Sequence, residues 1–296
     1  MIAIRRLRSL TTILRRRSYS AVKQGSKYSQ NYRQYLKLDN GEIGSYFHDI
    51  PMELNHLNRT VNMVVEIPRW THAKFEISKD LPFNPITQDV KKGKVRFVNN
   101  IFPFYGYIHN YGAIPQTWED PTVNHEIGEG RALVGDNDPL DCCEIGSSVF
   151  TTGEIKTVKI LGSIALIDDG ELDWKVIVIN VKDPLASSVN NIHDVEKHFP
   201  GLLTATRNWF RDYKVPMNKL KNEFAFNGEY KDVTETIKVI EECHNTWKGL
   251  ISGGLDGSKI GKLPQVQRAG NNVTMSDNEE PESDIPKDLD KWYYVE

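Results

Sequence analysis

The sequence predicts an α+β fold in which a barrel or sandwich of short strands precedes the helices. Residues 61–182 contain short runs rich in Val and Ile, separated by Gly, Pro, Asn or Asp, and closely spaced short strands are typical of barrels and sandwiches. From Asn191 onward the apolar residues instead follow the spacing of helices. Because the helices follow the strands rather than alternating with them, we expect them to pack outside the barrel.

Five strands are predicted in the first part of the chain: Val61 to Ile67, Ala73 to Ile77, Val95 to Val98, Glu154 to Ile167 and Trp174 to Val181. In the second strand, the apolar residues alternate with Lys74 and Glu76, so both charged side chains project from the face opposite the core. Taken alone, this pattern indicates only a solvated strand face. The hairpin around Gly170, flanked by Asp168 and Asp173, is equally ordinary by itself.

Two helices are predicted, Pro200 to Tyr213 and Asp232 to Ile251. The second begins with Asp232 and Glu235 at the spacing of a capping box. One apolar stripe along it contains Val233, Ile237, Ile240, His244, Trp247 and Ile251. Because His244 lies on this stripe, we expect it in the core.

The first 19 residues contain six Arg and no Lys, Asp or Glu, a composition typical of a mitochondrial transit peptide. The sequence Arg17-Ser18-Tyr19-Ser20 matches a matrix cleavage pattern, so we expect a mature chain that begins near Ser20 and lies in the mitochondrial matrix. The alternative is a basic surface helix. The rest of the chain is net acidic, which argues against a nucleic-acid partner.

The last part of the chain, residues 254–296, is polar and rich in Gly, Asp, Glu and Pro up to about Asp288, which predicts disorder. It ends in an aromatic segment that includes Trp292, and we expect this segment to dock on the body of the protein or on a partner subunit. No apolar run approaches the length of a membrane span. The three cysteines form no disulfide framework, which fits a reducing compartment.

The segment Asp136-Asn137-Asp138-Pro139-Leu140-Asp141 places three carboxylates in six residues. In an extended segment Asp136 and Asp138 would leave on the same face, and Pro139 would stiffen the turn toward Asp141. Carboxylates without His or Cys nearby suit Mg²⁺ or Mn²⁺, but a solvated acidic turn is an alternative. An EF-hand loop is excluded, because Asp141 stands where Gly is required and Ser147 where Glu is required.

This acidic segment fits the D-x-D-P-hydrophobic-D motif, and the chain resembles the eukaryotic branch of the family I inorganic pyrophosphatases. Further matching stretches are Val65 to Trp70, His109 to Gly112, Pro115 to Pro121, Asp173 to Val176 and Phe199 to Leu203. The resemblance covers roughly residues 62–253, and Asp290-Lys291-Trp292 resembles the end of fungal members.

The resemblance implies an OB-like five-stranded β-barrel with peripheral helices, which hydrolyses pyrophosphate with several Mg²⁺ ions. It implies a catalytic domain at 20–253, followed by the polar extension at 254–296. The fungal likeness also implies a homodimer, for which Trp70 and Trp292 are the expected interface residues.

Each site residue takes its role from the resemblance. Asp138 is expected to hold the attacking water and take its proton. The expected metal ligands are Asp136, Asp138, Asp141, Asp168, Asp173, Glu76 and, in a metal-linked position, Glu66. The residues expected to bind the two phosphates are Lys74, Arg96, Tyr107, Tyr111, Lys175, Tyr213 and Lys214, with Tyr111 and Arg96 also counted as catalytic.

The expected chemistry accounts for these residue types. Pyrophosphate carries up to four negative charges, so the site must neutralise its oxygens and make hydroxide available near neutral pH. Two alternatives stay open at this point. One is a metal-dependent phosphohydrolase that acts on tripolyphosphate or nucleotides, and the other is an OB-type nucleic-acid-binding module, which would need a basic groove with interleaved aromatics.

Overall fold

A computed structural model describes residues 18–128, 130–255, 260–270 and 272–296. Most of the expected transit peptide, residues 1–17, therefore lies outside the described residues. Within the described part, no helix has both the length and the apolar character needed to cross a membrane.

The central sheet has six strands in the order β15-β13-β10-β4-β14-β16. Their bounds are β4 (Thr60–Ile67), β10 (Asn110–Ala113), β13 (Asp141–Glu144), β14 (Ile155–Asp168), β15 (Glu171–Asn180) and β16 (Glu223–Phe224). Because β15 also pairs with β14, five strands pair in a cycle that runs from β4 through β10, β13, β15 and β14 back to β4. Within the cycle only the β13–β15 pair is parallel.

A second sheet lies beside the first and has the order β17-β1-β2-β6-β5, with β3 paired to β2. Its strands are β1 (Ser20–Ser26), β2 (Arg33–Lys37), β3 (Ile43–Gly44), β5 (Phe75–Ile77), β6 (Ile86–Gln88) and β17 (Asn278–Glu280). Three short pairs complete the described strands: β7 (Val90–Lys91) with β8 (Lys94–Val95), β9 (Asn100–Ile101) with β18 (Trp292–Tyr293), and β11 (His125–Gly128) with β12 (Arg131–Leu133).

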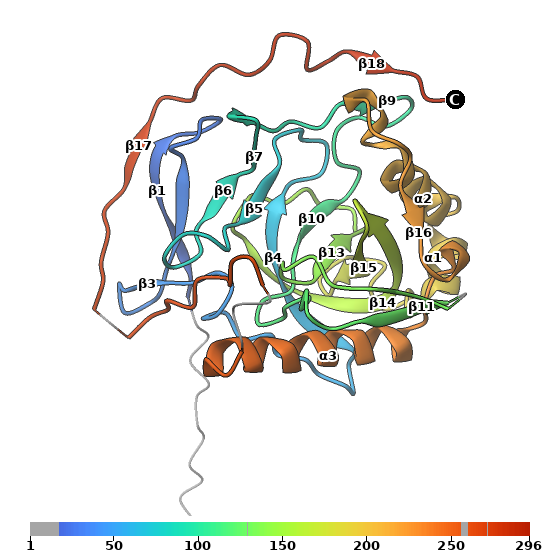
Figure 1. The fold of residues 1–296 in the computed structure, drawn as a ribbon, viewed down its shortest axis with the longest axis horizontal. Helices are drawn as coiled ribbons and strands as arrows, with labels where there is room; N and C mark the ends of the chain where they lie inside the picture. The colour runs from blue at the N-terminus through green and yellow to red at the C-terminus, as the bar shows by residue number, and fades with distance from the viewer. Residues whose placement is uncertain (1–17, 129, 256–259, 271) are drawn as a thin grey trace, which may run out of the picture.

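The helices lie outside the central sheet, as predicted (Figure 1). They are α1 (Ile192–His198), α2 (Leu202–Asp212) and α3 (Val233–Ser252), with short 3₁₀ turns η1 (Val215–Met217) and η2 (Phe226–Gly228). The predicted capping box is present, since Asp232 accepts from the Glu235 amide and Glu235 reaches back to the Asp232 amide. In Figure 1, α3 runs across one end of the sheet, and α1 and α2 lie at its side.

Both faces of the central strands are buried, which explains their nearly continuous apolar sequences. In β4, Val61 and Met63 belong to one apolar cluster, whereas Val64 and Ile67 belong to the other. The strand therefore separates two packed layers. From Val61 to Val65 the alternation follows the two-residue period of a strand, and Ile67 joins the cluster of Val64 because the register with β10 shifts between Val65 and Ile67.

Two local predictions differ from the structure. Of the predicted strand Val95 to Val98 only Val95 lies in a strand, β8, because β8 pairs with β7 across the turn at residues 92–93 and the chain beyond it makes only an isolated bridge, from Phe97 to Ala73. His244 is only partly buried, and its Nδ1 is 2.7 Å from the Gln116 carbonyl oxygen. The prediction that His244 lies in the core is wrong. The ring is at the border of the buried face of α3, where it bonds to the Gln116 carbonyl.

The described part of residues 254–296 lies along the body of the protein instead of being disordered (Figure 1). The amide of Ile43 donates to the Val273 carbonyl at 2.8 Å, and β17 adds a parallel strand to β1. At the end of the chain, β18 pairs with β9, and Trp292 packs against Phe102 with ring centroids 5.8 Å apart. Backbone pairing thus holds a segment whose composition alone predicts disorder.

Candidate active site

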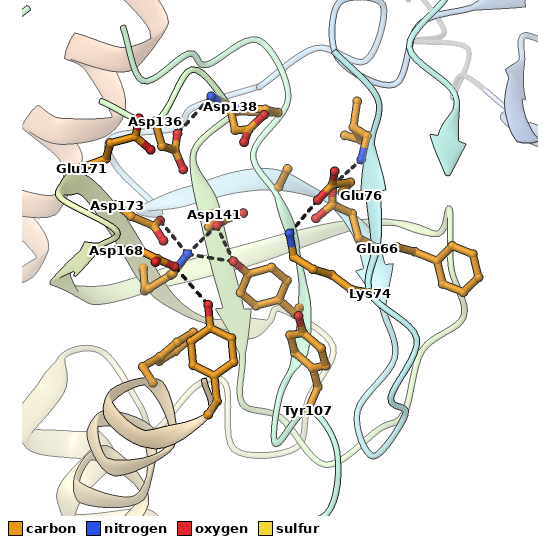
Figure 2. Close-up of a pocket in the computed structure, with 18 of the residues that line it drawn as sticks. Glu66, Lys74, Glu76, Tyr107, Asp136, Asp138, Asp141, Asp168, Glu171 and Asp173 are labelled. Carbon is orange, nitrogen blue, oxygen red and sulfur yellow. Dashed lines mark hydrogen bonds and ion pairs between the residues drawn. The ribbon is translucent and has the colours of Figure 1, made fainter. Parts of the chain in front are cut away.

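A cavity of about 280 Å³ collects charged side chains from both sheets and from the end of α2 (Figure 2). Its carboxylates are Glu66, Glu76, Asp136, Asp138, Asp141, Asp168, Asp169, Glu171 and Asp173. Its hydrogen-bond donors are Lys74, Lys79, Lys175, Lys214, Tyr107, Tyr111 and Tyr213. The structure therefore brings together every predicted metal-binding and phosphate-binding residue except Arg96, which is not among the residues that line the cavity.

The strand register places the first group of these side chains. Asp141 begins β13 and lies opposite Lys175 of β15. Asp173 is two residues before Lys175 on the same strand, so both side chains leave on the same face. Asp168 ends β14, and the hairpin to β15 returns the chain so that Asp168 lies opposite Glu171.

The acidic loop is a turn and not the extended segment expected from the sequence. Asn137 has a left-handed backbone with φ of 69°, which Asn tolerates better than most residues. The Asp138 amide donates to Asp136 Oδ1 at 3.0 Å. The expectation that alternation would direct these two carboxylates is wrong. They reach the same cavity because the chain turns at Asn137.

The segment before β11 fixes this turn. The Glu119 amide donates to the Asp138 carbonyl, and the Asn137 amide donates to the Glu119 carbonyl, both at 2.9 Å. Trp118 Nε1 donates to Asn137 Oδ1 at 3.0 Å. Gly135 allows this close approach, because a Cβ there would lie 2.5 Å from the Glu119 carbonyl carbon.

Lys175 is the centre of a buried network. Its Nζ lies 2.5 Å from both Asp141 Oδ2 and Asp173 Oδ1, and 2.8 Å from the Tyr111 hydroxyl. Tyr111 in turn donates to Asp141. Burial alone would lower the pKa of Lys175, but the two carboxylates outweigh it and hold the pKa well above its usual value. The lysine therefore stays charged.

A second network lies on the opposite wall. Lys74 Nζ is 2.7 Å from Glu76 Oε2 and 3.4 Å from Asp89 Oδ2, and Arg96 pairs with the same Asp89 carboxylate. Arg96 is thus connected to the cavity through Asp89 and Lys74. Nearby, Glu66 Oε1 accepts from the Ile77 amide at 2.7 Å.

The third network joins the end of α2 to the β14–β15 hairpin. The Tyr213 hydroxyl donates to Asp168 Oδ2 at 3.0 Å, and Lys214 pairs with the other oxygen of the same carboxylate. Lys214 Nζ is also 3.3 Å from Asp169 Oδ2. These contacts bring two predicted phosphate-binding groups to the rim of the carboxylate cluster.

Sequence reasoning missed Lys79, Glu119, Asp169 and Glu171. Lys79 Nζ lies 2.8 Å from Asp138 Oδ1, yet Lys79 follows a strand in a polar loop that gives no local signal. Glu119 lies in the stretch Pro115 to Pro121, whose likeness to the family could have marked it.

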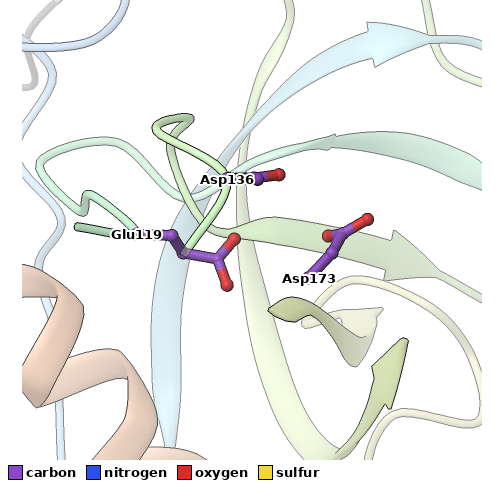
Figure 3. A group of neighbouring side chains, drawn as sticks. All are labelled: Glu119, Asp136 and Asp173. Carbon is purple, nitrogen blue, oxygen red and sulfur yellow. The ribbon is translucent and has the colours of Figure 1, made fainter. Parts of the chain in front are cut away.

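Glu119, Asp136 and Asp173 can hold a cation together. One carboxylate oxygen from each lies within 4.8 Å of the others (Figure 3). Glu119 Oε1 accepts from the Trp174 amide at 3.1 Å, whereas the buried Oε2 has no hydrogen-bond partner among the described residues. An unpartnered buried carboxylate oxygen fits a divalent cation with hard oxygen ligands.

The pKa values of the buried carboxylates also indicate a cation-binding site. Burial raises the pKa of Asp136 well above its usual value, and repulsion from Asp138 and Asp173 adds to the rise. Burial also raises the pKa of Asp173 to about 7, although Lys175 opposes the shift. The pKa values of Glu66 and Glu76 are raised as well, chiefly by burial. Divalent cations would relieve this crowding.

Carboxylates that can hold cations thus face Lys and Tyr donors that can hold phosphate oxygens, an arrangement that defines a metal-dependent phosphohydrolase. The family model of inorganic pyrophosphatase matches residues 63–248. The chain belongs to the inorganic pyrophosphatase family, as its motifs predicted. Its enzyme class is therefore that of the inorganic diphosphatases, hydrolases of phosphoanhydride bonds.

Similar proteins cover nearly the whole chain. The mitochondrial inorganic pyrophosphatase of Saccharomyces cerevisiae is 59% identical over 297 residues, which cover 99% of this chain and 96% of the relative. An inorganic pyrophosphatase of Kluyveromyces lactis is 51% identical over 94% of this chain and 98% of its own length. The solved structure of inorganic pyrophosphatase from Schistosoma japonicum superposes with a TM-score of 0.83 at 42% identity, covering 93% of this chain and 100% of that one.

Proposed function

We propose that this protein hydrolyses inorganic pyrophosphate to two phosphates with the help of Mg²⁺ ions held in the cavity. The observation that carries the proposal is the pairing, within one cavity, of nine carboxylates with four lysines and three tyrosines. Cations and substrate anions can be bound there side by side. Mn²⁺ or other divalent ions with a preference for oxygen ligands are expected substitutes.

Carboxylates that line the cavity would supply the metal ligands. Asp136, Asp141 and Asp173 would hold the resident ions, with Glu119 as an additional oxygen donor near Asp136 and Asp173. Glu76 and Asp168 would take up ions that arrive with the substrate. Glu66 would occupy a metal-linked position near Glu76. When bound, Mg²⁺ neutralises phosphate oxygens and lowers the pKa of water.

Asp138 would serve both as a metal ligand and as the group that orients the attacking water and accepts its proton. Its carboxylate stands at the cavity and is 43% exposed, so water can reach it. The hydrogen bond from its amide to Asp136 Oδ1 fixes its position relative to the metal-binding wall. A positioned carboxylate of this kind is a suitable general base.

The lysine and tyrosine side chains of the same cavity would bind the phosphates. Lys74, Tyr107, Tyr111, Lys175, Tyr213 and Lys214 place their polar groups in the cavity. The lysines would neutralise phosphate oxygens, and the tyrosine hydroxyls would donate hydrogen bonds to them. Arg96 would join this group by exchanging its contact with Asp89 for a phosphate oxygen.

The homodimer proposal is supported by exposed aromatic side chains. Trp70 is 57% exposed and Trp292 is 38% exposed. Phe102 and Tyr105 pack against Trp292 with ring centroids 5.8 Å and 6.3 Å away. Exposed aromatic clusters of this kind mark interaction surfaces.

Two further proposals concern the fold and the location. The cycle of five paired strands supports an OB-like β-barrel. The acid-free, Arg-rich start of the chain and the likeness to a mitochondrial relative support import into the mitochondrial matrix.

Phosphate release from pyrophosphate tests the function. We expect rapid release with Mg²⁺ and loss of release when EDTA removes it, with restoration on return of Mg²⁺. Tripolyphosphate and ATP serve as comparison substrates and should be hydrolysed far more slowly. Equal turnover with and without divalent ions, or preference for a nucleotide, would contradict the proposal.

A further inference from the structure

Lys79 forms an ion pair with Asp138 that the proposed reaction does not explain. Its Nζ lies 2.8 Å from Asp138 Oδ1, and the two side chains are 31% and 43% exposed. Lys79 follows β5 in the loop that leads to β6. A freely moving lysine at this position would gain little from such a pair, because exposed ion pairs are weak. The surrounding contacts, however, restrict the loop.

Residues 262–265, which we call the 262–265 segment, hold the loop that carries Lys79. The Gln265 amide donates to the Lys79 carbonyl at 2.7 Å. Asn84 Nδ2 donates to the Gln265 carbonyl at 3.0 Å, and Lys262 Nζ lies 3.0 Å from Asp80 Oδ1. The loop is therefore held at Lys79 itself and at two residues that follow it, Asp80 and Asn84.

The same segment also contacts the acidic loop. Asn137 Nδ2 donates to the Lys262 carbonyl at 3.1 Å, and Asn137 directly precedes Asp138. Both partners of the ion pair are thus anchored to one short segment. This segment lies beyond residue 248, where the match to the family model ends.

We propose that Lys79 is a positioning residue, which holds the Asp138 carboxylate when no metal is bound and must be displaced before a divalent cation can bind Asp138. The 262–265 segment fixes Lys79 in this position. The Lys79 ammonium group already occupies Asp138 Oδ1, and its positive charge repels a divalent cation that approaches the same carboxylate. The two therefore compete, and the competition lowers the affinity for the cation. The inference rests on the proposed metal role of Asp138.

Mg²⁺ binding to the metal-free, full-length protein tests the competition, measured by isothermal titration calorimetry without substrate. Lys79→Met should increase the Mg²⁺ affinity of the site that includes Asp138 about fivefold, because it removes the competing ion pair. Lys79→Arg, which keeps the charge, should stay within about twofold of the parent protein. Lys219→Met removes a cation that pairs with Asp169 at 3.1 Å, and it should also leave the affinity unchanged.

The role of the 262–265 segment is tested by a matched pair of variants. Gln265→Pro removes the amide that contacts Lys79 but keeps the carbonyl, whereas Gln265→Ala keeps both. Gln265→Pro should increase the Mg²⁺ affinity, as Lys79→Met does. Gln265→Ala should bind Mg²⁺ as the parent protein does. Thermal unfolding of each variant establishes that it is folded before titration.

The outcomes separate this inference from the proposed function. If Asp138→Asn leaves the number and affinity of bound Mg²⁺ ions unchanged, the metal role of Asp138 fails. If Asp138→Asn weakens binding but Lys79→Met has no effect, or an effect equal to that of Lys219→Met, the function stands and the positioning role of Lys79 is overturned. Weaker Mg²⁺ binding by Lys79→Met would overturn it too.

Discussion

Lys175 Nζ lies 2.5 Å from Asp173 Oδ1, and both side chains are almost fully buried, at 3% and 7% exposure. The two residues are neighbours on one face of β15, so the strand itself supplies a cation for its own carboxylate. Asp141 shares the same ammonium group from β13. Lys175 thus compensates the negative charge of both Asp141 and Asp173.

Replacement of Lys175 by Met should destabilise the metal-free protein by about 3 kcal/mol at pH 8, because it leaves buried carboxylates without their partner. Saturating Mg²⁺ should recover part of the loss. Urea unfolding with EDTA and with Mg²⁺ measures both effects. Lys219→Met is the control, since it breaks an exposed pair and should cost less than about 1 kcal/mol. Equal losses in the two variants would contradict the role of Lys175.

Asp138→Asn should reduce turnover about 10²-fold to 10⁴-fold, because the amide keeps the shape of the side chain and cannot accept the proton. The thermal midpoint should change little. Asp169→Asn is the comparison, because Asp169 also lines the cavity but has no assigned part in the reaction. Initial rates of phosphate release at saturating pyrophosphate decide between them, and near-normal turnover by Asp138→Asn would remove it as the general base.

Mg²⁺ should stabilise the folded protein, because the folded state gathers carboxylates that the unfolded chain keeps apart. At a concentration 100 times the dissociation constant, the gain should be about 2.7 kcal/mol for one site. Thermal unfolding with increasing Mg²⁺ measures it, and the combined variant Asp136→Asn with Asp173→Asn should lose most of the shift. A shift of the same size in that variant would place the ions elsewhere.

Stability should fall in acid partly because of His48. Its Nδ1 accepts from Trp247 Nε1 at 2.9 Å, and its Nε2 lies 2.9 Å from the Gln265 carbonyl oxygen, so the folded state requires the neutral ring. Burial lowers the pKa of His48 from 6.5 to about 4, and nearby Arg268 contributes. Between these values the unfolded chain binds the proton and the folded protein does not, so stability is lost as the pH falls.

The expected loss through His48 is about 2.5 kcal/mol between pH 7.5 and pH 4.5. His48→Gln keeps polar atoms at the site but does not titrate. Urea unfolding of both proteins at the two pH values should show a larger fall for the parent protein. Equal losses of unfolding free energy in the two proteins would mean that protonation of carboxylates, and not of His48, causes the loss.

Trp292→Ala should weaken the proposed homodimer and raise the monomer fraction, because the aromatic cluster would lose its central ring. Light scattering after size exclusion, over a range of protein concentrations, measures this fraction. Leu57→Ala is the control, since Leu57 is 91% exposed and lies outside the cluster. A parent protein that is monomeric at every concentration would reject the dimer itself.

The strands and helices with strong periodic patterns were predictable from sequence. The prediction Val61 to Ile67 agrees with β4, and the prediction Asp232 to Ile251 agrees with α3 within a residue at each end. Local spacing and capping determine these elements. In contrast, β1 and β17 were not predicted, because each is stabilised by a partner strand that no local pattern reveals.

The site residues also divide into those that the sequence predicted and those that it did not. Asp136, Asp138 and Asp141 form one motif and could be assigned together, whereas only folding brings Lys79 to the cavity and Glu119 close to Asp136 and Asp173. The Asn137 turn places the motif against the segment that carries Glu119, and the C-terminal extension places Lys79. Such contacts between distant segments depend on tertiary structure, so sequence spacing could not predict them.

The parallel pairing of β1 with β17 has a consequence for the order in which the protein is completed. The amide of Lys23 donates to Asp277, 254 positions later in the chain. A chain that leaves a ribosome or a translocation channel with its N-terminus first exposes this edge of β1 until nearly all of the chain has emerged. The newly made N-terminal strand is therefore open to chaperones throughout that interval, and closure of its edge is among the last steps of vectorial folding, before β18 pairs with β9.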